Sequence, residues 1–239
     1  MANSFAPVPG RRPAQKTRPA RAISQRAYTR GVKTERHEYE HGAIGEEGLL
    51  SDPIAQLQIW LDEVRDSGTV EPTAMSLATV DPDGRPSNRI VLLRGLDARG
   101  LVFYTNYLSH KGQALAANPF AAVTFWWGGM ERQVRVEGAI ERVPAAEADA
   151  YFEGRPIKSR YASAISPQSK VIGSREELEV KMAELQEAYP EGPPRPDHWG
   201  GYLLIPEKIE FWQGRRARLH DRFLYSRTDA AWDIVRLAP

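Results

Sequence analysis

The chain has 239 residues, of which 41% are hydrophobic, so it is long enough to bury a substantial core in one domain. It contains no cysteine, which excludes disulfides, thiolate metal sites, iron–sulfur clusters and cysteine nucleophiles. Any redox chemistry therefore needs a bound organic cofactor. No apolar run approaches the roughly 18 residues that cross a bilayer, and the N-terminus lacks the apolar stretch of a secretory signal. We expect a cytoplasmic protein with no membrane segment.

The net charge of +1 conceals a basic N-terminal tail on an acidic body. Residues 1–34 hold eight of the 32 Lys and Arg residues and none of the 31 Asp and Glu residues. The tail is rich in proline, alanine and arginine, which predicts disorder over about its first twenty residues. Three interpretations of it stay open: a solubilising extension, an arm that binds nucleic acid or phosphate, and an organelle transit peptide.

The first predicted element is a helix at DPIAQLQIWLDEVRDSG, residues 52–68. Asp52 can cap this helix, and Pro53 suits its first turn. Apolar residues recur at helical spacing up to Val64 and form one stripe, which we expect to face the core.

From residue 72 onward the spacing of apolar residues changes from that of a helix to that of β-strands. Five strands are predicted, at 73–80, 85–96, 101–105, 120–127 and 131–143, with turn sequences such as DPDG and DARG between them. Short connections make such a meander antiparallel, and amphipathic strands of this kind close into a barrel that leaves no long edge open. We therefore predict a mainly β fold with α (α+β): an antiparallel barrel with peripheral helices, in a single domain over residues 35–239.

Three more helices are predicted. The first is capped by Ser109 and ends before Pro119, and the second runs from Pro144 to about residue 152. The third lies in SREELEVKMAELQEAY, where Ser174 and Glu177 have the spacing of a capping box. Residues 151–169 are expected to be a helix end and a proline-broken loop. Strands return at 201–205, 208–213, 219–226 and 232–237.

Several stretches have the residue types of an anion-binding site. In RIVLLR, alternation places Arg89 and Arg94 on opposite faces of a strand, where they are either parts of a site or solvated strand ends. Ser109, His110 and Lys111 stand at a helix start, whose free backbone N–H groups suit a phosphate. The motifs GxxxxGK[ST] and GxGxxG are both absent, which argues against nucleoside triphosphates and dinucleotides.

Two further groups have similar chemistry. The 151–169 segment contains a guanidinium, a phenol and hydroxyls, which are phosphate ligands or ordinary loop residues. Gln133, in the middle of a strand, could hydrogen-bond a heteroaromatic ring edge or face solvent. In a strand, Arg218, His220 and Arg222 would share one face, which favours a site over scattered charge.

Taken together, the motifs RIVLLR, FYTN..S.KG, ERQVRVEG, YF..RP..S, S.QS, WGGY, EFWQG, RLHDR and RLAP resemble the pyridoxamine/pyridoxine 5′-phosphate oxidase family in order and spacing, over about residues 54–239. The resemblance implies an FMN-binding split barrel that forms a homodimer with FMN at the subunit interface. It implies oxidation of pyridoxine and pyridoxamine 5′-phosphates to pyridoxal 5′-phosphate, with O2 reduced to H2O2. Neither a metal site nor a nucleic-acid or membrane partner is expected.

The resemblance also assigns residues. The FMN-binding positions would be Arg89, Ile90, Val91, Leu92, Leu93, Arg94, Tyr104, Thr105, Ser109, His110, Lys111, Gln133, Gln168, Ser169, Trp212 and Arg222, with Gln168 and Ser169 supplied through the interface. The substrate-binding positions would be Arg94, Tyr151, Arg155, Ser159, Arg218, Leu219 and His220. Arg218 and His220 would flank the pyridine ring as the catalytic pair.

Three positions depart from the family pattern. Arg94 and His110 stand where lysine and arginine are usual. The family's lid over the substrate has an arginine three residues before a tyrosine, whereas Gln25 holds that place before Tyr28. Two rival functions stay open: a flavin oxidase of the phenazine type acting on another cyclic substrate, and a nucleic-acid-binding barrel with a basic arm.

Overall fold

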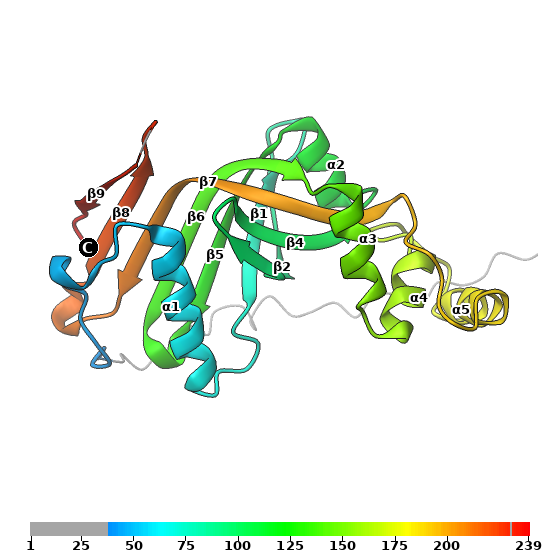
Figure 1. Ribbon diagram of the computed structural model, residues 1–239, viewed down its shortest axis with the longest axis horizontal. Helices are drawn as coiled ribbons and strands as arrows, with labels where there is room; N and C mark the ends of the chain where they lie inside the picture. Colours follow the sequence, from blue (N-terminus) through cyan, green and yellow to red (C-terminus); the bar gives the residue numbers. More distant parts are fainter. Residues whose placement is uncertain (1–37, 230) are drawn as a thin grey trace, which may run out of the picture. The chain divides into compact units, whose positions relative to one another are not determined.

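The computed structural model describes residues 38–229 and 231–239. The basic tail, with its predicted disorder, lies outside the described residues. Within them, nine strands join in one antiparallel sheet with five α-helices around it (Figure 1). The prediction of a mainly β fold with peripheral helices is therefore confirmed.

The strands follow the order β2-β1-β5-β6-β7-β4-β3, and β8 and β9 extend the sheet from β7. The strand bounds are Ala74–Val80 (β1), Pro86–Leu92 (β2), Gly95–Asp97 (β3), Gly100–Asn106 (β4), Phe120–Trp127 (β5), Arg132–Arg142 (β6), Trp199–Gln213 (β7), Asp221–Arg227 (β8) and Trp232–Arg236 (β9). The helices are Pro53–Asp66 (α1), His110–Ala117 (α2), Ala145–Glu153 (α3), Ile157–Ile165 (α4) and Glu176–Ala188 (α5), with short 3-10 turns at Glu46–Gly48 (η2), Gly128–Met130 (η3) and Arg216–Arg218 (η4).

The predicted strand 85–96 is divided in the structure, and its division closes the barrel. Its first part, β2, pairs with β1, whereas its second part, β3, pairs with β4 at the far end of the sheet order. The change of partner occurs at two residues: the Leu93 N–H donates to Thr73 O (2.9 Å), and the Arg94 N–H donates to Val102 O (2.8 Å). No pairing joins β2 to β4 in the described chain, so the sheet has a gap between these two strands.

The predicted strands 201–205 and 208–213 form one long strand, β7. The pairing of β6 with β7 shifts register between Glu137 and Gly138, which accommodates one extra residue of β7 as a bulge. A side chain at Gly138 would overlap the carbonyl oxygen of Ile205, so this bulge requires glycine.

Helix α1 packs its predicted stripe into the barrel core. Asp52 accepts a hydrogen bond from the Ile54 N–H (2.9 Å), which confirms the predicted cap. The ring of Trp60 lies edge-on to Phe211 of β7, with centroids 5.1 Å apart. Both residues belong to the main cluster of buried hydrophobic side chains, which joins α1 to β1, β4, β5, β6, β7 and β8.

The segment between α3 and α5 differs from its prediction. It was expected to be a loop, but it contains α4, which begins directly after Pro156. A proline that lacks an N–H is compatible with a helix start, where that donor would be unpaired. The predicted capping box does not form either: α5 begins after Arg175 without a side-chain cap, and Glu177 instead accepts from the Gly173 N–H (3.4 Å).

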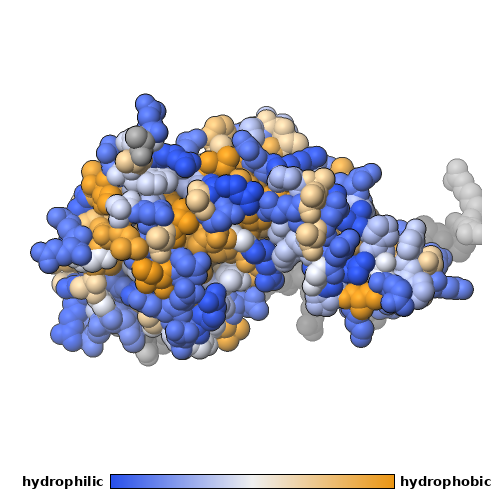
Figure 2. Space-filling model, viewed as in Figure 1, coloured by the Kyte–Doolittle hydropathy of each residue, from blue (hydrophilic) through white to orange (hydrophobic). Residues whose placement is uncertain are grey.

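In Figure 2, apolar residues gather over the strands in the left half of the view, whereas the helices at the right end are mainly hydrophilic. Large apolar side chains exposed on the described surface include Ile90, Trp126 and Leu219. Among the described residues, no helix has both the length and the apolar character needed to cross a bilayer.

The turn between β3 and β4 depends on Gly100, whose φ is 144° and whose added side chain would overlap the Leu204 carbonyl. We predict that Gly100→Ala lowers the free energy of unfolding by at least about 2 kcal/mol, because backbone strain and overlap act together. Gly129→Ala is the matched control, since a side chain there would meet nothing within 4 Å. Urea unfolding of both variants measures the difference, and equal stability would contradict this account of the turn.

Candidate active site

A pocket of about 310 Å³ lies at the gap between β2 and β4. It is lined by Ile90, Val91, Leu92, Arg94, Tyr104, Thr105, Lys111, Tyr151, Arg155, Ser163, Gln168 and Trp199. None of these residues is acidic, and three carry a positive charge. A larger cavity of about 490 Å³ lies between α4, α5 and the proline-rich segment before β7, but its few charged residues include both signs. The pocket beside β2 therefore has the chemistry of an anion-binding site.

Lys111 stands at one end of this pocket. Ser109 caps α2 by accepting from the Gly112 N–H (3.3 Å), which sets the first turn of the helix beside β4. The Lys111 ammonium donates to Thr105 Oγ1 (3.1 Å) and to Gln168 Oε1 (2.9 Å). Both acceptors are neutral, so the charge of this buried ammonium is not compensated by a carboxylate at these contacts.

Arg89 of β2 lies close enough to Lys111 to affect its ionisation. Burial, and then repulsion from Arg89, lowers the pKa of Lys111 to about 8. Burial also lowers the pKa of Arg89, and the nearby Asp81 opposes that effect. Arg89 donates to neutral oxygens of Leu77, Thr79 and Ser87. A bound anion would offset the desolvation of both cations and the repulsion between them.

A second pair of cations, Arg94 and Arg155, lies in the same pocket. Arg155 donates to Ser163 Oγ (2.7 Å), and its guanidinium carbon lies 4.6 Å from the centre of the Trp199 ring. Burial lowers the pKa of Arg155, attraction to Tyr151 raises it, and repulsion from Arg94 lowers it again. These arginines come from the β2–β3 junction and the α3–α4 junction, so two chain segments join to form the second anion subsite.

The same pocket is lined by an aromatic stack: the rings of Tyr104 and Tyr151 have centroids 3.7 Å apart, and Trp199 stacks on Tyr104 at 5.4 Å. Gly201 of β7 lies opposite Tyr104, and a side chain there would meet the tyrosine ring at 2.8 Å. The glycine of the WGGY motif therefore leaves room for this stack. Burial raises the pKa of Tyr104 to about 12, so its phenol stays protonated at neutral pH.

A separate aromatic cluster lies where β7 ends and β8 begins. The Trp212 ring has its centroid 4.6 Å from that of His220, 5.7 Å from that of Tyr39 and 5.9 Å from that of Trp126. Gln133 pairs in register with Trp126 and Trp212 on the two neighbouring strands. In the described part of the chain, this cluster shares no lining residue with the pocket.

The hydrogen bond at His220 determines its tautomer. The backbone N–H of Arg215 donates to His220 Nδ1 (3.1 Å). Because that N–H can only donate, the neutral imidazole carries its proton on Nε2. Burial and the charge of Arg218 lower the pKa of His220, and Asp221 opposes them. His220 is therefore a neutral hydrogen-bond donor through Nε2 at neutral pH.

The expectation that Arg218, His220 and Arg222 share one face of a strand is wrong. Ala217 and Arg218 have φ values of 54° and 61°, so the chain forms the turn η4, and β8 begins only at Asp221. Arg222 donates to Glu210 Oε1 (2.8 Å), a bond that raises the pKa of Arg222. Glu210 thus pairs the charge of Arg222 within the chain, so Arg222 does not join Arg218 and His220 in one group.

The structure brings fewer than half of the expected FMN and substrate residues into one pocket and leaves the others outside its lining. Gln168 contacts Lys111 within a single chain, whereas we expected it to come through the subunit interface. Leu93 is buried in the main core, and the Ser109 hydroxyl is buried in the cap of α2. His110 bonds Asp81 Oδ2 (3.0 Å) rather than lining the pocket. Expected residues that do not line it also include Ser159, Ser169, Gln133, Trp212, Leu219 and Arg222.

Three residues near these sites had no role in the sequence analysis. Ser163 and Trp199 line the pocket, and Tyr39 lies 5.5 Å from His220 between ring centroids. Trp199 belongs to the quoted motif WGGY, which was a usable signal. Ser163 had no such signal, because α4 was not predicted.

The lid expected at Gln25 and Tyr28 stays a prediction, because these residues lie outside the described ones. Among the described residues, Tyr39 packs beside Trp212 and His220. Within the described residues, no cluster of three or more His, Cys, Asp and Glu side chains could hold a metal ion.

Comparison with known proteins places this geometry in a family. The family model described as pyridoxamine 5′-phosphate oxidase matches residues 61–189. A second model, the pyridoxine 5′-phosphate oxidase C-terminal dimerisation region, matches residues 199–239. The second match contains Trp212, His220 and the turn between them.

Relatives and solved structures agree with these matches. A pyridoxine/pyridoxamine 5′-phosphate oxidase of Ralstonia nicotianae is 52% identical over 205 residues, which cover 85% of this chain and 97% of the relative. One from Thermosynechococcus vestitus is 50% identical over 204 residues, with the same coverage of both chains. The crystal structure of PhzG from Burkholderia lata, in complex with tetrahydrophenazine-1-carboxylic acid, matches with a TM-score of 0.77 and 33% identity, covering 81% of this chain and 95% of that one. The chain therefore belongs to the pyridoxamine 5′-phosphate oxidase family, a family of oxidoreductases.

Proposed function

We propose that the protein is an FMN-dependent homodimeric oxidase that converts pyridoxine and pyridoxamine 5′-phosphates to pyridoxal 5′-phosphate, with O2 reduced to H2O2. One observation carries this proposal: two pairs of cations lie in or beside one pocket whose lining residues include no carboxylate. Each phosphate carries nearly two negative charges at pH 7, so two phosphorylated ligands would balance the two pairs. The names of the relatives at about 50% identity support the same substrates.

The pair of Arg89 and Lys111 suits the FMN phosphate. Both groups are desolvated and bonded to neutral oxygens, so a phosphate would replace weak partners with charge-assisted hydrogen bonds. Ile90 to Leu92 and Tyr104 would then line the flavin ring. A bound flavin would supply the hydride acceptor and the route of electrons to dioxygen.

The pair of Arg94 and Arg155 suits the phosphate of the substrate. Ser163 and the Trp199 ring hold the Arg155 guanidinium in place, so little conformational freedom is lost when it binds. Tyr151 lies beside it, with its ring fixed on Tyr104. Arg94 has a forked guanidinium that can bind a phosphate with two parallel hydrogen bonds, whereas a lysine there would act as a point charge.

Arg218 and His220 would act on the pyridine ring. The neutral His220 can donate a hydrogen bond through Nε2, and Arg218 places a positive charge near it. These residues are apart from the pocket in one chain, so we infer that they complete the pocket of a second subunit. Their position in the region that matches the family's dimerisation model supports this arrangement.

A second candidate is oxidation of a reduced phenazine carboxylate, because PhzG shares the fold at 33% identity. A phenazine carboxylate offers one carboxylate to Arg94 and Arg155, whereas a vitamer offers a phosphate. The higher identity to the pyridoxine/pyridoxamine 5′-phosphate oxidases favours the vitamers.

The direct test is to incubate the purified protein with FMN and pyridoxine or pyridoxamine 5′-phosphate in air. We expect pyridoxal 5′-phosphate, measured by its absorbance, and one equivalent of H2O2 for each product. Pyridoxine without the phosphate is the control and is expected to turn over poorly, because Arg94 and Arg155 would have no anion to bind. Turnover of a tetrahydrophenazine carboxylate, with none of either vitamer phosphate, would reverse the assignment.

Substitutions separate the two anion subsites. We predict that Lys111→Ala weakens FMN binding by at least about tenfold, since a charge-assisted hydrogen bond contributes roughly 1.5–3 kcal/mol. Arg218→Ala is expected to lower kcat/KM by a similar or larger factor and to leave FMN affinity nearly unchanged. Fluorescence titration of FMN and steady-state kinetics measure the two effects. Equal loss of FMN from both variants would disprove the assignment of Lys111 to the FMN phosphate and of Arg218 to the substrate.

The lowered pKa of Lys111 predicts how FMN affinity depends on pH. The free site loses the Lys111 proton near pH 8, whereas a bound phosphate favours the ammonium and raises that pKa, so binding takes up a proton above pH 8. We expect the FMN dissociation constant to be constant between about pH 7 and 8, where the phosphate is already a dianion, and to rise up to about tenfold per pH unit above 8.

Lys111→Arg is the matched variant, because a guanidinium stays protonated throughout this range. Its FMN affinity is expected to show no change of slope near pH 8. The same change of slope in both proteins would mean that another group is responsible.

A further inference from the structure

The loop Gly214–Asp221 carries Arg218 and His220, and its backbone is strained. Ala217 and Arg218 are consecutive non-glycine residues in the left-handed region, with φ values of 54° and 61°. Side chains with a Cβ disfavour this conformation, and it persists only where surrounding contacts hold it. The contacts that hold this loop therefore determine where Arg218 and His220 lie.

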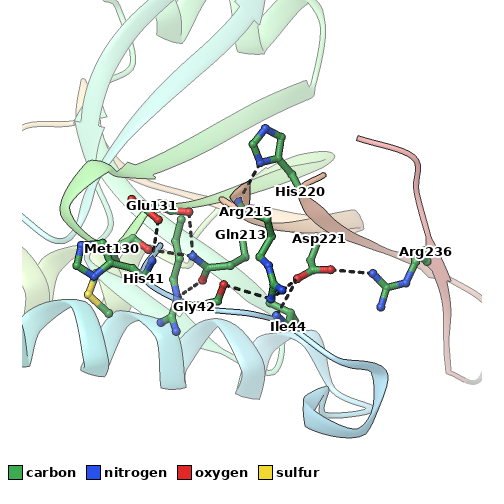
Figure 3. A network of polar contacts seen from close by, with 11 residues as sticks. His41, Gly42, Ile44, Met130, Glu131, Gln213, Arg215, His220, Asp221 and Arg236 are labelled. Carbon is green, nitrogen blue, oxygen red and sulfur yellow. Dashed lines mark hydrogen bonds and ion pairs between the residues drawn. The ribbon is translucent and has the colours of Figure 1, made fainter. Parts of the chain in front are cut away.

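A segment from the start of the described chain, residues 38–44, runs beside this loop and bonds it repeatedly. Glu38 accepts from the Ala217 N–H (3.4 Å), and Glu40 accepts from Arg216 (2.6 Å). The carbonyl of Gly42 accepts from the Arg215 guanidinium (3.4 Å), as Figure 3 shows.

The base of the loop is fixed by Gln213, which is almost fully buried. Its side-chain amide donates to the carbonyls of Met130 (3.1 Å) and Glu131 (3.2 Å), and its oxygen accepts from Arg132 (2.9 Å). The Glu131 carboxylate in turn accepts from the His41 N–H (2.9 Å), which ties residues 38–44 to the same base. Figure 3 shows these bonds as one connected network.

Asp221 joins three separate parts of the chain at the other end of the loop. Its Oδ2 accepts from the Ile44 N–H (3.1 Å) and from Arg215 (3.4 Å), and its Oδ1 accepts from Arg236 of β9 (2.9 Å). The side chain is 15% exposed, so water screens these bonds only partly. By contrast, the pair of Glu40 and Arg216 is largely exposed and contributes little.

Tyr39 adds a packing contact at Gly214. A side chain at position 214 would lie 2.7 Å from Tyr39 Cγ and 3.0 Å from Glu131 Cβ, so the tyrosine rests directly on the loop backbone. The Tyr39 ring also makes T-shaped contacts with the rings of Trp212 and His220.

We propose that residues 38–44 and the Asp221 carboxylate form a clamp that positions the loop bearing Arg218 and His220. Asp221 is a positioning residue: it acts through the Arg215 side chain and the Ile44 backbone, and it holds the turn whose Arg215 N–H orients His220. The role given to Arg218 and His220 rests on the proposed function, whereas the clamp itself rests on the contacts of the folded chain.

The test is Asp221→Asn in the full-length protein, which keeps the shape of the side chain and removes its charge. We expect kcat/KM for pyridoxine 5′-phosphate to fall on the order of tenfold, because displacing a catalytic group by 1 Å can cost up to 10²-fold. FMN affinity is expected to change by less than about threefold, since Arg89 and Lys111 lie on other elements. Hydrogen exchange measured by NMR is expected to accelerate at the amides of Ile44, Arg215 and Ala217.

Glu46→Gln is the matched control, because Glu46 contacts the same Arg236 (3.7 Å) but is exposed and outside the clamp. We expect it to leave kcat/KM and exchange at the three amides unchanged. A double-mutant cycle of Asp221→Asn with Arg215→Gln is expected to be non-additive in kcat/KM, which general destabilisation of the fold would not produce.

Gly214→Ala provides a second variant, since its methyl group would displace Tyr39 without changing any charge. Faster exchange at Ala217 in this variant would support the clamp. The clamp would be overturned if amide exchange and kcat/KM were unchanged in both Asp221→Asn and Gly214→Ala. It would also be overturned if FMN affinity fell by the same factor as kcat/KM. If the wild-type protein oxidises neither vitamer phosphate, the proposed function fails, and the exchange measurements still decide the clamp.

Discussion

The site depends on one change of partner in the backbone. The segment 86–97 pairs with β1 over its first half and with β4 over its second half, and the change occurs at Leu93 and Arg94. This change closes the barrel, and it also forces β2 and β4 apart, because one strand cannot follow both neighbours along its whole length. The pocket lies in that gap, so barrel closure and the presence of a binding site have the same cause.

The charge of the pocket follows from its position. Lys111, Arg94 and Arg155 reach it from α2 and from two junctions between elements, where no neighbouring strand supplies a carboxylate. Neutral oxygens and the Trp199 ring hold these cations, which is enough to orient them but not to neutralise them. Several arginines elsewhere are paired with carboxylates, as Glu210 shows with Arg135 and Arg222. Three cations therefore line a pocket that has no acidic lining residue, which is the charge pattern that suits a phosphorylated ligand.

The chain also separates the cationic pocket from the loop that carries Arg218 and His220. The pocket belongs to β2, β4 and the helices, whereas His220 and Arg218 lie on a strained loop beyond β7. Such a loop needs outside support, and residues 38–44 supply it from a distant part of the sequence. Among the described residues, Trp199 is the one lining residue of the pocket that lies in the region matching the family's C-terminal dimerisation model.

Local pattern determined much of this protein. The stripe and cap of α1, the alternation in β1 and β5, and the residues that could bind phosphate all follow from short-range spacing, because each depends on neighbours a few positions apart. Tertiary structure alone decided the partner change at Leu93 and Arg94, the left-handed turn at Ala217 and the approach of Tyr39 to His220. These features arise from contacts between residues far apart in the chain. The free energy of those contacts exceeds the local conformational preference, and such contacts produce no periodic pattern in the sequence.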